Sequence, residues 1–180
     1  AIGIANADVR LIRAAVADFA KANDIVSINV SVTHTHSGID LQGVWDSTVG
    51  NVLNNITLGA LGITKLQSGV DRKFLQTIID QTAKSIKDAT ADMKTGELTL
   101  AKMDIGDEYL RDRTYPDCYD GNMYRLEFTP DKVGATPTII ATFGVHPENS
   151  GFGHTVISAD FIPYTEQVLN AAGYNFIFIQ

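Results

Sequence analysis

Residues 25–35 alternate apolar and polar side chains, a pattern that predicts a β-strand with one buried face. His34 and His36 continue the aliphatic positions of this pattern. Because side chains two residues apart in a strand point to the same side, the two imidazoles are expected to leave the strand end together. The chain is therefore expected to build a sheet with a polar site at one edge.

Three helices are predicted around this strand. Apolar residues recur at three- and four-residue spacing over residues 6–23 and again over residues 71–93. A third helix is predicted from Pro163 to Gly173, since proline suits a first helical turn and glycine ends a helix. Residues 37–69 are rich in Gly, Asn, Ser and Thr, which predicts a long irregular segment with a short helix around residues 49–53.

Further strands are predicted in the second half of the chain, at residues 97–105, 123–129, 138–146 and 174–179. The second and third of these are joined by a Pro/Asp/Lys/Gly turn, which favours an antiparallel hairpin. The predicted class is mixed α/β, a sheet flanked by helices, with about five strands and three main helices. Strand-like segments stand at both ends, so residues 1–180 are expected to be one domain that is a fragment of a larger one.

Composition narrows the possible partners. The chain has 180 residues, 44% of them hydrophobic and 19% charged, a balance typical of a folded globular domain. Its net charge is −7, with 14 basic residues against 21 acids, which argues against a nucleic-acid partner. Cys118 is the single cysteine, so no intrachain disulfide is possible. The first residues lack the layout of a signal peptide, and no apolar run is long enough to cross a membrane.

Three histidines are candidate metal ligands. His34 and His36 leave one predicted strand, and His146 leaves another apolar strand just before a proline. Imidazole is a good ligand for zinc, and strand ends are places where sites form. The alternative is a structural or surface pair at 34 and 36 and a hydrogen-bonded core histidine at 146. The presence of all three favours the metal site.

Two weaker sets accompany the histidines. Asp160 can orient a ligand histidine such as His154 through its second ring nitrogen, or it can cap the helix that begins near Pro163. Arg111 and Arg113 lie in a turn region and suit a developing oxyanion or a substrate carboxylate. A solvated salt bridge with neighbouring acids is the simpler account of these arginines.

Several of these residues stand in an order that resembles a known family. The order is Thr33-His34-Thr35-His36-Ser37-Gly38, Asp112-Arg113-Thr114, His146-Pro147 and Ile157-Ser158-Ala159-Asp160, followed by a helix and an apolar strand. It resembles the N-terminal part of the catalytic domain of the neutral/alkaline, non-lysosomal ceramidases. The first string is the most specific part of the resemblance, which runs through nearly the whole chain.

The resemblance implies a function and a site. Members of this family are zinc amidases that cleave the N-acyl bond of ceramide to sphingosine and a fatty acid, usually outside the cell or on its envelope. By resemblance, His34 and His146 would bind Zn²⁺, while His36 and Arg113 would stabilise the oxyanion. The expected partners are a sphingolipid or other acyl-amide substrate, a membrane surface reached through that substrate, and the remainder of the same catalytic domain.

One departure from the family pattern leaves alternatives open. The family usually continues Ser-Gly-Pro-Gly-Gly, whereas this chain has Ser37-Gly38-Ile39-Asp40-Leu41. The changed loop favours a zinc hydrolase of another acyl amide or an ester. The family's remaining zinc ligands, a Glu and a Tyr, would lie beyond Gln180. A truncated relative that only binds metal or lipid is the third alternative.

Overall fold

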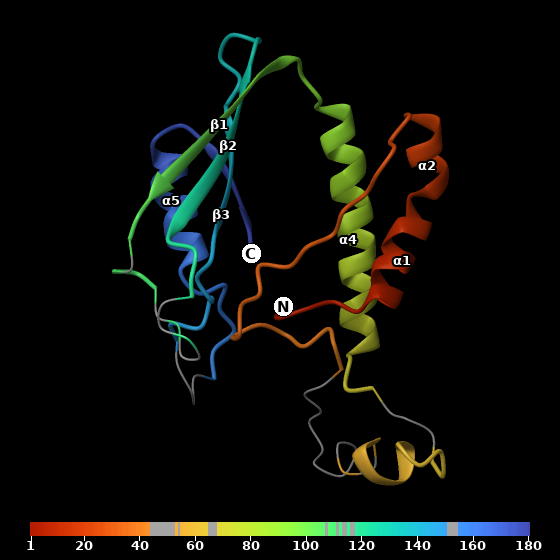
Figure 1. Cartoon of the computed structure of the whole chain (residues 1–180). Coiled ribbons are helices and arrows are strands. Elements are labelled where there is room, and N and C mark those ends of the chain that lie inside the picture. The colour runs from red at the N-terminus through yellow and green to blue at the C-terminus, as the bar shows by residue number, and fades with distance from the viewer. Residues whose placement is uncertain are drawn as a thin grey trace. The chain divides into compact units, whose positions relative to one another are not determined.

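The computed structural model divides the chain into two compact units (Figure 1). The helical unit comprises Ala1–Val30 and Gly38–Asp92, and the sheet unit comprises Ser31–Ser37 and Met93–Gln180. The expected single domain stays a prediction. The residues that the structure describes are 1–43, 53, 55–64, 68–106, 108–110, 112, 115, 118–150 and 155–180.

The first predicted helix is present as two shorter ones, α1 (Asn6–Ala15) and α2 (Ala17–Ala22). Val16 separates them with φ −122° and ψ 12°, outside the helical region. Its N–H bonds to the carbonyl of Arg13, three residues back, which tightens the last turn of α1. Apolar spacing alone did not predict this break, since the spacing continues through it.

The second predicted helix is confirmed as α4 (Arg72–Ala91). Ile12 of α1 packs with Leu75 of α4 in a buried core. Of the short helix predicted around residues 49–53, only Leu53 is described, and a π-helical turn, η1 (Asn55–Gly59), follows it. Among the helices described, none combines the length and the apolar character needed to span a bilayer.

The sheet unit contains a four-stranded mixed sheet in the order β1-β2-β3-β4. Both β1/β2 and β2/β3 are antiparallel, which confirms the predicted hairpin, and β3/β4 is parallel with α5 between the two strands in the chain. The mixed α/β class is therefore confirmed. The bounds are β1 (Gly96–Asp104), β2 (Asn122–Pro130), β3 (Thr138–Phe143), α5 (Ile162–Ala171) and β4 (Asn175–Ile179).

One face of the sheet is covered by α5. Phe143 of β3, Phe178 of β4 and Ile162 of α5 form a buried cluster on this face. The right-handed connection expected for a parallel β–α–β unit needs a helix packed on the sheet in this way. Phe143, the last residue of β3, belongs to this cluster and stands three residues before His146, so the start of the loop that carries His146 is anchored in the core.

The other face of the sheet has a row of aliphatic side chains. Leu100, Leu126, Ile140 and Ile177 are direct neighbours from β1 to β4. Leu100 is 76% exposed and Ile177 is 49% exposed. Both faces of the sheet thus carry apolar residues, which is the composition of a sheet that has a layer on each side.

The prediction of a strand over residues 25–35 is wrong. A strand requires backbone partners across a ladder, and among the described residues this segment has none. His34 has φ 56°, in the left-handed region, which a strand residue does not adopt. The strand predicted over residues 138–146 is present as β3 but ends early, at Phe143 instead of His146. The described part of the chain accordingly has four strands where about five were expected.

Candidate metal centre

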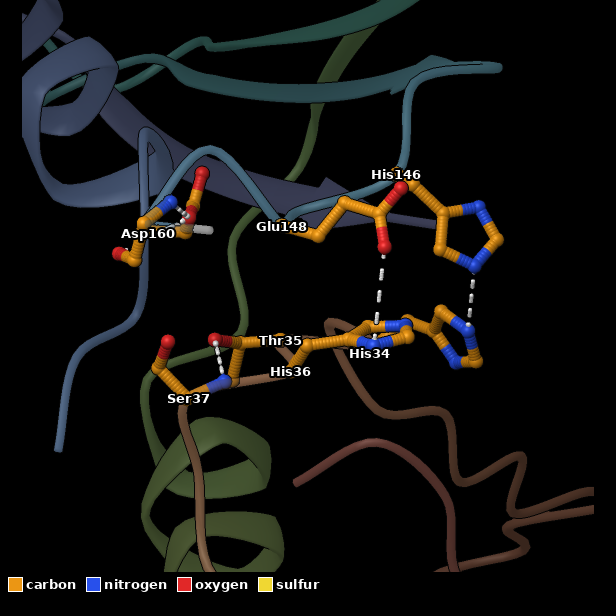
Figure 2. A network of polar contacts seen from close by, with 8 residues as sticks. His34, Thr35, His36, Ser37, His146, Glu148 and Asp160 are labelled. Carbon is orange, nitrogen blue, oxygen red and sulfur yellow. Dashed lines mark hydrogen bonds and ion pairs between the residues drawn. The ribbon is translucent and has the colours of Figure 1, made fainter. Parts of the chain in front are cut away.

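The segment with the first two histidines is held by the side chain between them. Thr35 is 4% exposed, and its hydroxyl donates a hydrogen bond to the carbonyl of Ser158 (2.8 Å). The same hydroxyl oxygen accepts from the N–H of Ser37 (3.3 Å), whose carbonyl accepts from the N–H of Ser158 (3.0 Å). With Thr35 buried, the rings of His34 and His36 lie together on the side facing His146 and Glu148 (Figure 2). The expected common direction of the two rings is present without a strand.

The loop after β3 carries the third histidine. The N–H of Val145 bonds to the carbonyl of Phe143 (2.8 Å), and the N–H of Glu148 bonds to the carbonyl of His146 (2.9 Å). Pro147 between them is fully buried. Its carbonyl accepts a hydrogen bond from the N–H of His36 (3.1 Å), so the backbones of the two histidine loops are directly joined.

The three imidazoles converge. His34 Nε2 and His146 Nε2 are 3.0 Å apart, and the ring of His36 lies 5.2 Å and 5.1 Å, centroid to centroid, from those two rings (Figure 2). One nitrogen from each of the three rings falls within 4.8 Å of the others. No other group of three such ligands occurs among the described residues.

This arrangement fits a transition-metal ion. Two imidazole ligands of tetrahedral zinc, each about 2.0–2.1 Å from the ion, lie about 3.3 Å from one another. The 3.0 Å between His34 and His146 is close to that value. A hydrogen bond between the two rings has the same length, but it needs one Nε2 to carry a proton, whereas a shared ion needs both Nε2 atoms bare. Three imidazoles suit zinc, copper or iron better than magnesium or calcium.

The surroundings of His36 act on its protonation in opposite directions. Partial burial lowers its pKa most, the Glu148 carboxylate raises it, and the rings of His146 and His34 lower it further. The net result is a pKa below the ordinary 6.5. His36 therefore stays neutral to a lower pH than a free histidine, and the neutral ring is the form that binds metals.

Asp160 supports the loops around the site. It is 5% exposed, and its carboxylate accepts hydrogen bonds from the N–H (3.1 Å) and hydroxyl (3.4 Å) of Ser150 and from the N–H of Phe161 (2.8 Å). Phe161 is the N-cap residue of α5, and no side chain caps that helix. Asp160 therefore does not cap α5; its carboxylate instead binds Ser150 and the N–H of Phe161 within the loop. Its predicted role in orienting a ligand histidine stays a prediction.

Three further candidates, His154, Arg111 and Arg113, lie outside the described residues, and their roles stay predictions. A pocket of about 790 Å³ opens beside the centre, with His146 and Glu148 in its wall. This volume is within the usual range for small-molecule sites, roughly 300–1,000 Å³. Sequence reasoning passed over Glu148, although a carboxylate two residues after a candidate ligand is a signal that can be read from the sequence.

Comparison with known proteins bears on the fold. No protein-family model and no curated protein matches the sequence. Among solved structures, the neutral ceramidase of Pseudomonas aeruginosa matches 93% of this chain with a TM-score of 0.61 and 21% identity. A ceramidase complexed with C2 matches the same share with a TM-score of 0.63 and 21% identity. The chain has part of a ceramidase fold.

The match covers only part of each ceramidase. The chain covers 28% of the first ceramidase and 27% of the second, so it spans less than a third of the length of either. The ordered motifs had predicted a resemblance to part of a ceramidase, and that resemblance is confirmed at the level of the fold. The motif Thr33–Gly38 contributes two of the three rings of the centre in this ceramidase fold.

Proposed function

We propose that this chain is part of a zinc-dependent hydrolase that cleaves the N-acyl amide of ceramide or a closely related lipid. The observation that carries the proposal is the approach of His34 Nε2 and His146 Nε2 to 3.0 Å, with His36 beside them, on a ceramidase fold. Ceramide is the favoured substrate because both matched structures are ceramidases.

Each histidine has a proposed task. Zinc, when bound, supplies a Lewis acid that polarises an amide carbonyl and makes a water molecule acidic enough to attack it. His34 and His146 would hold the ion through Nε2. His36 and Arg113 would face the carbonyl oxygen and stabilise the negative charge that develops there, as donors in an oxyanion hole do. The pocket beside His146 offers room for the part of the substrate next to the scissile bond.

A second candidate function keeps the zinc and changes the substrate to another acyl amide or an ester. The observation in its favour is the sequence Ile39-Asp40 in place of the glycine-rich continuation of the family. The Asp40 carboxylate accepts hydrogen bonds from the N–H groups of Gln42 and Gly43, so it closes a local turn. A turn built in this way presents a different surface from a run of glycines.

Metal content and turnover separate these functions. We expect the full-length protein that contains this chain to bind one zinc ion and to hydrolyse a short-chain fluorogenic ceramide, with both properties lost in His34→Ala and in His146→Ala. Zinc binding with turnover of short acyl amides or esters but not of the ceramide would support the second function. A full-length protein that takes up no zinc at micromolar concentrations of the metal would overturn both.

A further inference from the structure

Glu148 faces the centre from the same loop that carries His146. Its Oε2 atom lies 3.8 Å from Nδ1 of His36, and Figure 2 shows the carboxylate directed at this ring. The two side chains are 40% and 35% exposed, so both are partly withdrawn from solvent. The proposed chemistry gives Glu148 no role so far.

The backbone holds this pair in place. The N–H of Glu148 bonds to the carbonyl of His146, and the N–H of His36 bonds to the carbonyl of Pro147 (3.1 Å). The carboxylate and the imidazole therefore project from two loops that are joined at the intervening residue, which is itself fully buried. Their approach depends less on the freedom of two long side chains than an ordinary surface ion pair does.

An imidazole has two nitrogens on opposite sides of its ring, and fixing one of them fixes the direction of the other. Carboxylates do this for histidines at metal centres and in catalytic triads. We propose that Glu148 is a positioning residue for His36: it holds Nδ1 and so leaves Nε2 as the nitrogen that faces the reacting atoms. This inference deepens the proposed function and rests on it for the catalytic meaning of His36.

The arrangement specifies what His36 can do. If the neutral ring keeps its proton on Nδ1, the nitrogen 3.8 Å from the Glu148 carboxylate, then Nε2 carries the lone pair and can accept a proton. The proton that the attacking water loses would go to this atom, which would then be an N–H donor toward the charged oxygen. Without the carboxylate, the His36 ring can flip or move its proton to the other nitrogen. Either change means that an unprotonated Nε2 no longer faces the substrate.

Nitrogen-15 spectra of the histidine rings test the positioning directly. In zinc-loaded protein we expect Glu148→Gln to shift the ring signals of His36, while those of His34 and His146 stay in place. Glu148→Asp should restore part of the wild-type signal. Glu166→Gln, the same chemical change at an exposed position of α5, should alter nothing. Unchanged His36 signals in Glu148→Gln would overturn the inference.

Kinetics give a second readout. With a fluorogenic short-chain ceramide we expect Glu148→Gln to lower kcat by about 10- to 100-fold, the usual effect of an outer partner of a metal centre, with KM and zinc content unchanged. Loss of zinc from this variant would mean that Glu148 supports the ligands and not His36, which also overturns the inference. A wild-type protein without zinc or turnover would instead refute the proposed function, and the ring spectra, recorded without zinc, would still decide whether Glu148 positions His36.

Discussion

His34, a proposed zinc ligand, has an uncommon backbone conformation. Its φ of 56° lies in the left-handed region, where non-glycine residues are few, although histidine is enriched among them. Such conformations cost about 1–3 kcal/mol and gather at functional sites, where the surrounding structure enforces them. The buried hydroxyl of Thr35 and its bonds supply that enforcement here.

This backbone strain can be measured separately from the loss of the ligand. His34→Ala and His34→Gly both remove the imidazole, but only glycine adopts a positive φ without a steric penalty. We expect the glycine variant to be more stable than the alanine variant by about 1 kcal/mol in urea unfolding without metal. Equal midpoints for the two variants would show that the left-handed conformation is not retained in solution.

The pKa of His36 predicts a pH dependence of stability. Its pKa in the folded protein is below the ordinary 6.5, so the unfolded chain binds more protons between the two values. The free energy of unfolding should therefore fall as the pH drops from about 6.5 toward the folded pKa, and should level off below it.

The comparison that isolates this effect is wild-type protein against His36→Gln. Both proteins, free of metal, would be unfolded in urea between pH 7 and pH 5. As the pH falls, the free energy of unfolding of the wild type should decrease relative to that of His36→Gln. A difference that does not change with pH would contradict the lowered pKa.

At the scale of elements, α4 has a well-defined start. The Asp71 carboxylate accepts hydrogen bonds from the N–H groups of Lys73 (2.8 Å) and Phe74 (3.0 Å), which satisfies two donors of the first turn. We expect Asp71→Ala to destabilise the protein by about 1 kcal/mol, with a smaller loss for Asp71→Ser, because serine also caps. Unfolding followed by circular dichroism measures both, and equal losses would contradict a capping role.

The elements that the sequence predicted well are those with local signals. The helix over residues 71–93 was predicted from apolar periodicity, and the helix from Pro163 to Gly173 from its proline and glycine. Both appear within two residues of the predicted bounds. The strand over residues 25–35 failed because a ladder depends on a partner far away in the sequence, which alternation does not reveal. The end of β3 at Phe143 also depends on a distant partner, since Phe143 pairs with Met123 at the beginning of β2.

The histidine cluster was predicted better than the strand over residues 25–35 that was expected to carry two of its members. Alternation placed His34 and His36 on one side, and burial of Thr35 produces the same outcome in a loop. The approach of His146 followed from its place after an apolar strand. Glu148 could have been noticed two residues after His146, but its contact with His36 depends on how two loops meet, which is a long-range property of the fold.

At the scale of the whole molecule, two members of the aliphatic row on the sheet, Leu100 and Ile177, are exposed apolar side chains. Leu100, at 76% exposure, is its most accessible member. Apolar patches of this kind bind hydrophobic dyes and promote association. We expect Leu100→Lys to bind less of such a dye and to aggregate less than the wild type, at unchanged stability. Thr99→Lys, which adds the same charge on the opposite face of β1, is the control, and an equal effect of the two would argue against the row.

The two Nε2 atoms at the centre belong to residues 112 positions apart. A cation bound by both would act as a reversible cross-link between these distant residues. Such a cross-link would stabilise the fold, since it lowers the conformational entropy of the unfolded chain. Heat resistance would then rise and fall with the supply of zinc, and a chelator would work as a denaturant. Scarcity of the metal would leave an unstable chain as well as an inactive one.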